Sequence, residues 1–137
     1  MNDCIFCKIV KDDVPCNKVY EDKDFLAFLD ISPCSKGHTL IIPKKHFETI
    51  LDTNDEILKD FIILIKKISK VIYEGLKCEG FNIIMNQFKA SGQIVPHLHA
   101  HIIPRFSDDG LRAWPHKKYD SEDEEKEIQE RITRLLK

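Results

Sequence analysis

The stretch His97-Leu98-His99-Ala100-His101-Ile102-Ile103 decides the fold, because imidazoles alternate in it with apolar side chains. Successive side chains of a β-strand point to opposite faces of a sheet, so the alternation predicts a strand over residues 97–103. The three histidines then share one face at spacings of about 7 Å. It is improbable that three of the chain's six histidines fall at two-residue steps by chance. This face is therefore the first candidate for a functional site.

Four other segments have the composition of strands. Two of them flank the polar turn Asp22-Lys23-Asp24 and predict a hairpin, which Pro33 ends. Another lies between Gly37 and Pro43 as a short apolar run, which is typical of a buried strand. The four predicted strands cover residues 18–21, 25–29, 39–42 and 81–86.

Two helices are predicted from their start signals. Thr53 and Glu56 have the spacing of a capping box, and apolar residues at three- and four-residue steps follow until a helix end near Gly75. A second capping box, from Ser121 to Glu124, opens an acidic C-terminal helix. Because no βαβ unit repeats, we predict an α+β fold with an antiparallel sheet, one main helix and a C-terminal helix.

The chain of 137 residues has the length of one domain, and we expect a single domain over residues 1–137, with a C-terminal extension at residues 107–137. The net charge of -2, with lysines scattered among acidic and apolar stretches, argues against a nucleic-acid partner. The apolar runs are too short to span a membrane, and the N-terminus lacks the pattern of a secretory signal. Five cysteines without an export signal favour the reducing cytoplasm.

Three imidazoles on one face suit either of two chemistries. They could hold a catalytic zinc with an open water position, although the twist of a sheet makes successive side chains diverge. Alternatively they handle phosphate, which the approach to the strand favours. The turn at residues 90–93 contains Gly92, whose backbone can come close to an anion, while Gln93 and Arg105 offer donors to phosphate oxygens.

Cys4 and Cys7 form a separate pair with the two-residue spacing of zinc sites. A redox pair is the alternative, although the βαβ setting of thioredoxin-like motifs is absent; two unrelated cysteines are a third interpretation. Cys16, Cys34 and Cys78 have no partner at such a spacing and are interpreted as core or surface thiols.

The histidine stretch resembles the signature of the histidine triad (HIT) family, and the resemblance extends over residues 4–105. The sequence is similar to the bacterial-type and Hint-like members, which act on nucleoside phosphoramidates and related nucleotides. Further segments fall in the family's order: residues 28–33, residues 37–46, Asn86 and Gly92-Gln93.

The resemblance implies a role for each of these residues. His99 would attack the α-phosphorus of a purine nucleotide and form a transient nucleotidyl-histidine, which water would hydrolyse. His101 and Gln93 would contact the phosphate, and His38 would be a fourth active-site histidine. Substrate-binding residues would be Asp30 at the ribose, Ile31 at the base and ribose, and Asn86 and Gly92 at the phosphate end.

The resemblance also implies a structural zinc and a dimer, and this chain departs from the family pattern at one position. Zinc would be bound by Cys4, Cys7, His46 and His97, which makes residues 1–17 a zinc-binding segment. Two subunits would pair through their sheets and main helices to form a homodimer. Ile94 stands where Hint-like members carry Ser or Thr, so the natural leaving group stays open. Dinucleoside polyphosphate hydrolysis, a zinc hydrolase with metal on the triad, and a nucleotide sensor with little turnover are the alternatives.

Overall fold

A computed structural model describes residues 3–136. Its centre is a five-stranded sheet in the order β1-β2-β3-β5-β4, in which every neighbouring pair is antiparallel. The elements are α1 Ile5–Val10, β1 Lys18–Glu21, β2 Phe25–Leu29, β3 Thr39–Pro43, α2 Asp55–Leu76, β4 Gly80–Ile84, the 3-10 turn η1 Lys89–Ser91, β5 Ala100–Arg105 and α3 Glu122–Leu135. The predicted α+β class, the hairpin and the main and C-terminal helices are confirmed.

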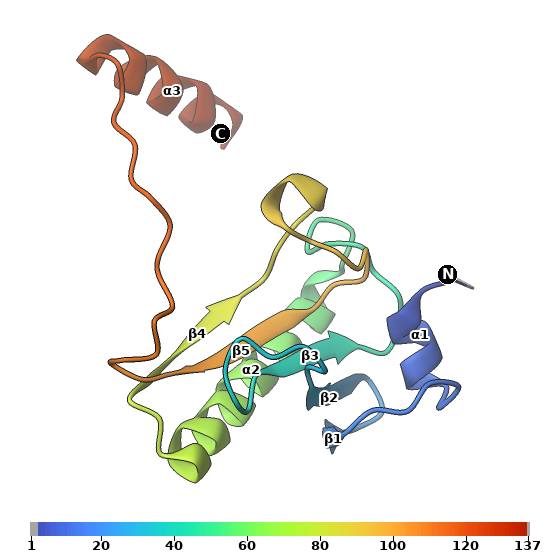
Figure 1. Ribbon diagram of the computed structural model, residues 1–137. Coiled ribbons are helices and arrows are strands. Elements are labelled where there is room, and N and C mark those ends of the chain that lie inside the picture. The colour runs from blue at the N-terminus through green and yellow to red at the C-terminus, as the bar shows by residue number, and fades with distance from the viewer. Residues whose placement is uncertain (1–2, 137) are drawn as a thin grey trace.

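The two faces of the sheet are covered differently (Figure 1). Helix α2 crosses one face, and its apolar side chains bury Ala27, Ile41, Ala100 and Ile102. The opposite face carries a second apolar cluster that includes Leu26, Phe28, Leu40 and Ile42, covered at one end by α1. Alternation along β2 and β3 therefore supplies both cores, as the two-residue period requires.

Leu98, Ala100 and Ile102 all belong to the core beneath α2. The alternating histidines consequently face away from α2, toward the side of the sheet on which α1 lies. Strand β5 begins only at Ala100, however, so the predicted strand at residues 97–103 starts too early. His97 lies in a bend and His99 in an irregular segment. Because neither residue is held to the period of a strand, the two rings need not point in the same direction.

The start of α2 differs from the prediction by one residue. The Asn54 side chain accepts a hydrogen bond from the Ile57 N–H and caps the helix, so the proposed capping box at Thr53 is wrong. The Thr53 hydroxyl instead donates to the carbonyl oxygen of Thr49 within the preceding loop. At the other end, α2 continues past Gly75 to Leu76, and Lys77 adopts the left-handed conformation that ends it.

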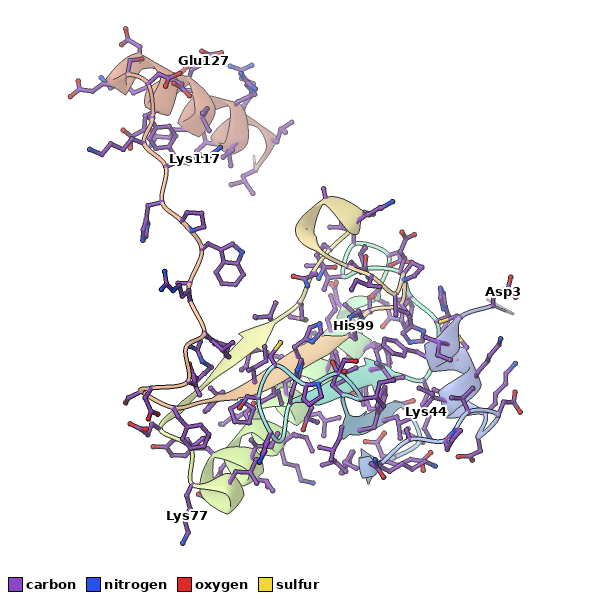
Figure 2. All side chains as sticks on the ribbon, viewed as in Figure 1. Asp3, Lys44, Lys77, His99, Lys117 and Glu127 are labelled. Carbon is purple, nitrogen blue, oxygen red and sulfur yellow. The ribbon has the colours of Figure 1, made fainter. Side chains whose placement is uncertain are left out.

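The C-terminal helix stands apart from the sheet at the end of a long extended segment (Figures 1 and 2). The Ser121 hydroxyl accepts from the Glu124 N–H, as predicted, but the Glu124 carboxylate bonds the N–H of Asp120 rather than that of Ser121. No described residue of α3 is buried. None of the helices in residues 3–136 is long and apolar enough to cross a membrane.

Candidate active site and thiol–imidazole cluster

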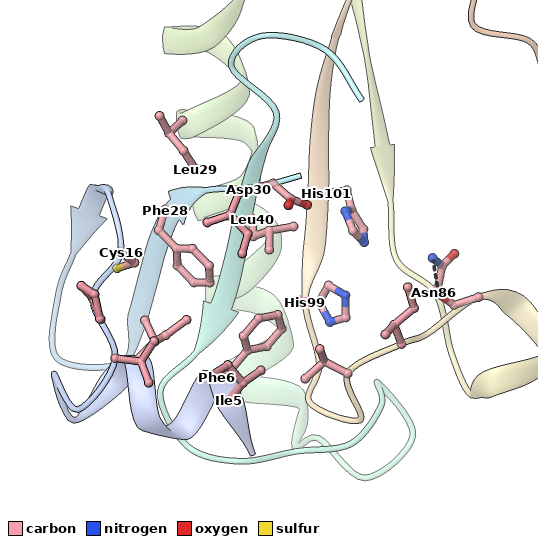
Figure 3. Close-up of a pocket in the computed structure, with 17 residues that line it drawn as sticks. Ile5, Phe6, Cys16, Phe28, Leu29, Asp30, Leu40, Asn86, His99 and His101 are labelled. Carbon is pink, nitrogen blue, oxygen red and sulfur yellow. Dashed lines mark hydrogen bonds between the residues drawn. The ribbon is translucent and has the colours of Figure 1, made fainter. Parts of the chain in front are cut away.

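A cavity of about 370 Å³ opens on the face of the sheet that carries the histidines (Figure 3). This volume is within the range of small-molecule binding sites. The residues that line it come from α1 and β2 with the segments that follow them, from β3 and β5, and from the segments around η1. They are Ile5, Phe6, Ile9, Val14, Pro15, Cys16, Phe28, Leu29, Asp30, Ile31, Leu40, Asn86, Gly92, Ile94, Val95, His99 and His101.

The wall of the cavity is apolar on one side and polar on the other. Phe28 and Leu40 lie opposite each other on β2 and β3, and the edge of the Phe6 ring faces Phe28 at a centroid distance of 5.7 Å. His99, His101 and Asp30 line the opposite, polar part (Figure 3). An apolar slot beside a few polar groups is the arrangement that holds a flat ring system and orients a polar substituent.

His99 is buried, and its tautomer follows from one hydrogen bond. Its Nδ1 lies 2.7 Å from the backbone carbonyl oxygen of His97, so Nδ1 must carry the proton and donate it to that oxygen. The other nitrogen, Nε2, is then left with a free lone pair. Burial lowers the pKa of His99, which keeps the ring neutral and nucleophilic near pH 7.

His38 and His101 form an imidazole chain in which each ring orients the next. The backbone N–H of Cys34 donates to His38 Nδ1 at 3.1 Å, so the proton of His38 is on Nε2. His38 Nε2 in turn donates to His101 Nδ1 at 2.9 Å, which leaves the N–H of His101 on Nε2. Burial, together with His99 and His38, lowers the pKa of His101 to about 4. In the free protein His101 is therefore a neutral hydrogen-bond donor.

Asp30 supports the imidazole chain from the end of β2. One carboxylate oxygen accepts from the Ser32 N–H, and the other lies 3.6 Å from His38 Nε2. Its backbone N–H also donates to the carbonyl oxygen of His38, so the two segments are tied together. The carboxylate is partly exposed to the cavity and is free to accept a further hydrogen bond.

The loop before β5 places Gly92 and Asn86 at the cavity but not the Gln93 side chain. Gly92 has a φ of 100°, which a residue with a Cβ rarely adopts, and its carbonyl oxygen lies 3.5 Å from Asn86 Nδ2. The buried Gln93 amide donates to the carbonyl oxygen of Glu48 and accepts from the Phe88 N–H. Gln93 thus joins two loops, and its predicted contact with phosphate stays a prediction.

Arg105 lies at the far end of β5, where its guanidinium is already paired. It donates to both carboxylate oxygens of Asp109, to Asn82 and to the carbonyl oxygen of Leu111. The expected contribution of Arg105 to phosphate binding is therefore not supported. Cys16, interpreted from sequence as a core or surface thiol, instead lines the cavity, and burial raises its pKa.

Beside the cavity lies the thiol–imidazole cluster, formed by Cys4, Cys7, His46 and His97. Helix α1 begins after Cys4, so the two thiols are one turn apart on the same helix face. Nδ1 of His97 lies 3.4 Å from the sulfur of Cys4 and 3.7 Å from that of Cys7, while Nδ1 of His46 lies 3.3 Å from Cys7.

These distances match the chemistry of a tetrahedral zinc site. Zn–S bonds of about 2.3 Å and Zn–N bonds of about 2.0 Å place sulfur and nitrogen ligands about 3.5 Å apart around a tetrahedral metal. His97 Nε2 donates to the Pro43 carbonyl oxygen at 2.8 Å, which fixes the ring and leaves the lone pair of Nδ1 directed at the thiols. The four residues therefore fit a zinc ion.

Zinc shared by the three triad histidines does not fit this geometry. His97 points its two nitrogens at Pro43 and at the cysteines, and His99 Nδ1 is bonded to the backbone. Within residues 3–136, the other group of potential ligand side chains within 4.8 Å of one another is Asp30, His38 and His101. In that group the facing nitrogens of the two rings are hydrogen-bonded to each other.

Comparisons with known proteins find similarity to one family. The sequence model of the HIT domain matches residues 11–108. Adenosine 5'-monophosphoramidase hnt1 of Schizosaccharomyces pombe is 46% identical over 114 residues, which cover 82% of this chain and 83% of that protein.

Solved structures are similar over nearly the whole chain. A HIT family member from Bacillus subtilis has a TM-score of 0.88 and 41% identity, with 96% of both chains covered. A Zn-bound histidine triad family protein from Mycobacterium smegmatis has a TM-score of 0.77 and 36% identity, with 98% of this chain and 96% of that chain covered.

Proposed function

The chain belongs to the HIT domain family, and from this membership and the geometry of the cavity we propose that it is a hydrolase of purine nucleoside phosphoramidates. The observation that carries the proposal is the hydrogen bond from His99 Nδ1–H to the His97 carbonyl oxygen. It makes Nε2 of His99 an unprotonated nucleophile on the wall of a cavity suited to a flat apolar ring.

In the first half-reaction, Nε2 of His99 forms a bond to the α-phosphorus and the P–N bond to the leaving amine breaks. The nitrogen that leaves must take up a proton, and we assign this proton to Nε2 of His101. The negative charge of a bound phosphate raises the pKa of His101, opposing the burial that lowers it in the free protein. Substrate binding thus supplies the acid that the free site lacks.

In the second half-reaction, water attacks the phosphorus of the nucleotidyl-histidine. One proton of the water passes to His101, the hydroxyl stays on the phosphorus, and the P–N bond to His99 breaks. His99 regains its lone pair, and the nucleoside monophosphate is released. The hydrogen bond between His38 Nε2 and His101 Nδ1 keeps Nε2 of His101 directed into the cavity, whichever of the two nitrogens holds the proton between them.

Four residues would hold the rest of the nucleotide. We assign Asp30 to the ribose hydroxyls, because its carboxylate is held by Ser32 at the edge of the apolar slot. Ile31 would border the base and ribose, and Asn86 and Gly92 would contact the phosphate end. All four line the cavity.

A phosphoramidate fits the cavity better than a dinucleoside polyphosphate does. A polyphosphate leaving group has several negative charges, which proteins neutralise with Lys or Arg. None of the described residues that line the cavity is Lys or Arg. Arg105 is paired with Asp109 elsewhere, and Lys89 borders an adjoining depression beyond Gly92.

We further propose that zinc bound by Cys4, Cys7, His46 and His97 stabilises the fold. A closed shell of two thiolates and two imidazoles leaves no position for a catalytic water. When bound, the ion would tie α1, the segment after β3 and the approach to β5 together. His97 then serves His99 only through its backbone carbonyl oxygen.

The proposed homodimer is supported by α2, on which Ile62 and Ile63 are 51% and 66% exposed. These side chains widen the apolar face of the helix beyond the part that packs on the sheet. Sedimentation at micromolar concentration should give twice the 16.0 kDa of one chain. A mass of one chain would contradict the dimer.

Incubation with adenosine phosphoramidate tests the proposed function. We expect release of adenosine monophosphate by the wild-type protein. The released amine and the monophosphate should appear in equal amounts. Binding of the nucleotide without release would favour the sensor, and complete loss of turnover on brief chelation of a still-folded protein would favour a catalytic metal.

A further inference from the structure

An apolar ridge lies at the mouth of the cavity. It consists of Ile5, Ile94 and Val95, which line both the cavity and the depression next to it. Ile94 is 92% exposed, and it also borders a third depression that contains Gly92 and Lys89. Single exposed apolar residues are common on proteins, but a contiguous apolar rim around a cavity is typical of a ligand-binding surface.

In-line displacement at phosphorus restricts where the leaving group can lie. In-line attack puts the leaving atom opposite the attacking nitrogen of His99. The inner slot between Phe6, Phe28 and Leu40 is suited to the base. Gly92 and the exposed Ile94 line the same cavity outside this slot and are available to the departing group.

The chemistry of the mouth selects the kind of amine. With no Lys or Arg among the described lining residues, a charged leaving group finds no ionic partner in the cavity. The exposed Ile94 side chain has no hydrogen-bonding group. A bound ligand is therefore stabilised there only when its own apolar surface covers Ile94. Val95 and Ile5 extend this surface past the mouth.

We propose that the apolar ridge is a leaving-group subsite and that Ile94 selects amines with an aryl or alkyl body over the unsubstituted amine. The inference rests on the proposed phosphoramidase activity, and it names the leaving group of that same reaction. The body of the amine would lie on Ile94 while its nitrogen stays bonded to phosphorus above the imidazoles.

The test compares two substrates, adenosine phosphoramidate with an unsubstituted amino group and the phosphoramidate of phenethylamine. We expect wild type to have the higher kcat/KM with the phenethylamine conjugate. In Ile94→Ser this preference should fall about tenfold, equivalent to about 1.4 kcal/mol, and Ile94→Leu should retain most of it. Leu51→Ser is the matched control, because Leu51 is 76% exposed but does not line the cavity.

The outcomes separate the two proposals. A preference that is unchanged in Ile94→Ser, with both substrates still cleaved, overturns the leaving-group subsite and leaves the phosphoramidase activity standing. The subsite is likewise overturned if Leu51→Ser lowers the preference as much as Ile94→Ser does. If wild type cleaves neither substrate, the proposed function and the subsite both fail.

Discussion

The thiol–imidazole cluster and the imidazole chain take their histidines from the same two short segments, residues 38–46 and 97–101, and use them in opposite ways. In the cluster, the Nδ1 lone pairs of His46 and His97 converge with two sulfur atoms. In the imidazole chain, His38 Nε2 donates a hydrogen bond to His101 Nδ1. Convergent lone pairs suit a cation, whereas a series of donors and acceptors suits a phosphate and the movement of protons.

For His97 and His99 the position of the ring proton decides what the ring can bind, and a backbone carbonyl oxygen decides that position. His97 donates through Nε2 to Pro43, which frees Nδ1 for metal, while His99 donates through Nδ1 to His97, which frees Nε2 for phosphorus. The Phe6 ring contacts the rings of both His97 and His99, at centroid distances of 5.8 and 5.1 Å. Equal spacing in sequence therefore does not imply a shared function.

The largest expected effect comes from His99→Ala. Turnover should fall by more than about a thousandfold, because only this ring can form the covalent bond to phosphorus. Affinity for adenosine monophosphate should change only a few-fold, since the apolar slot is intact. Turnover by stopped assay and affinity by calorimetry check both. Residual activity within tenfold of wild type would contradict the assignment of His99 as the nucleophile.

The next effect concerns the cluster and uses Cys4→Ser combined with Cys7→Ser. Zinc content should fall from about one ion per chain to near zero, and the melting temperature should fall by about 10 °C, equivalent to about 3 kcal/mol. Activity at low temperature should stay measurable, because no reacting group is removed.

Cys34→Ser is the control for zinc content, since the Cys34 side chain is exposed and lies outside the cluster. Elemental analysis and thermal unfolding provide the readouts. Absence of zinc from wild-type protein grown with zinc would contradict the site. Full retention of zinc in the double variant would contradict the cluster as the zinc site and favour the alternative, a hydrolase with metal on the triad.

A smaller effect is expected from His38→Phe, which keeps a ring at this position but removes the donor to Nδ1 of His101. Loss of a group that orients a functional imidazole commonly lowers activity by about 10- to 100-fold. The decrease should be in kcat, with KM within a few-fold and zinc content unchanged, because His38 touches neither the base slot nor the cluster. A decrease confined to KM would show that His38 binds substrate rather than positioning His101.

The smallest effect is on the pH dependence of stability. The pKa of His101 is about 4 in the folded protein, below the ordinary value of 6.5. As pH falls from 6.5 toward 4, the unfolded chain takes up a proton that the folded chain does not, so stability decreases. His101→Asn should therefore lose less melting temperature than wild type between pH 7 and pH 5. Equal losses would contradict the neutral, buried state of His101.

Much of the fold could be predicted from sequence because strand alternation and helix periodicity are local. The hairpin and the face of α2 follow from them directly, and so does the placement of Leu98 and Ala100 on the face opposite the histidines. The cap of α2 is harder to place because Thr53 and Asn54 are both good capping residues, and only the loop contact to Thr49 decides between them. Helix α1 is too short for a periodic pattern.

The site is harder to predict where function depends on distant partners. Residue types and spacing indicate His97, His99 and His101, but not which nitrogen of each ring is free. The side-chain amide of Gln93 is a suitable donor to phosphate. In the structure, however, it donates to the carbonyl oxygen of Glu48 and accepts from the Phe88 N–H. The sequence pattern does not reveal the apolar slot, because its side chains come from α1, β2 and β3 and meet only in the folded chain.

The stereochemistry of hydrolysis tests the central claim most directly. A P-chiral adenosine phosphorothioate amide, hydrolysed in isotopically labelled water, reports whether the configuration at phosphorus is inverted or retained. Two in-line displacements, first by Nε2 of His99 and then by water, predict overall retention. Inversion would mean that water attacks the substrate directly, and would contradict the proposed nucleotidyl-histidine intermediate.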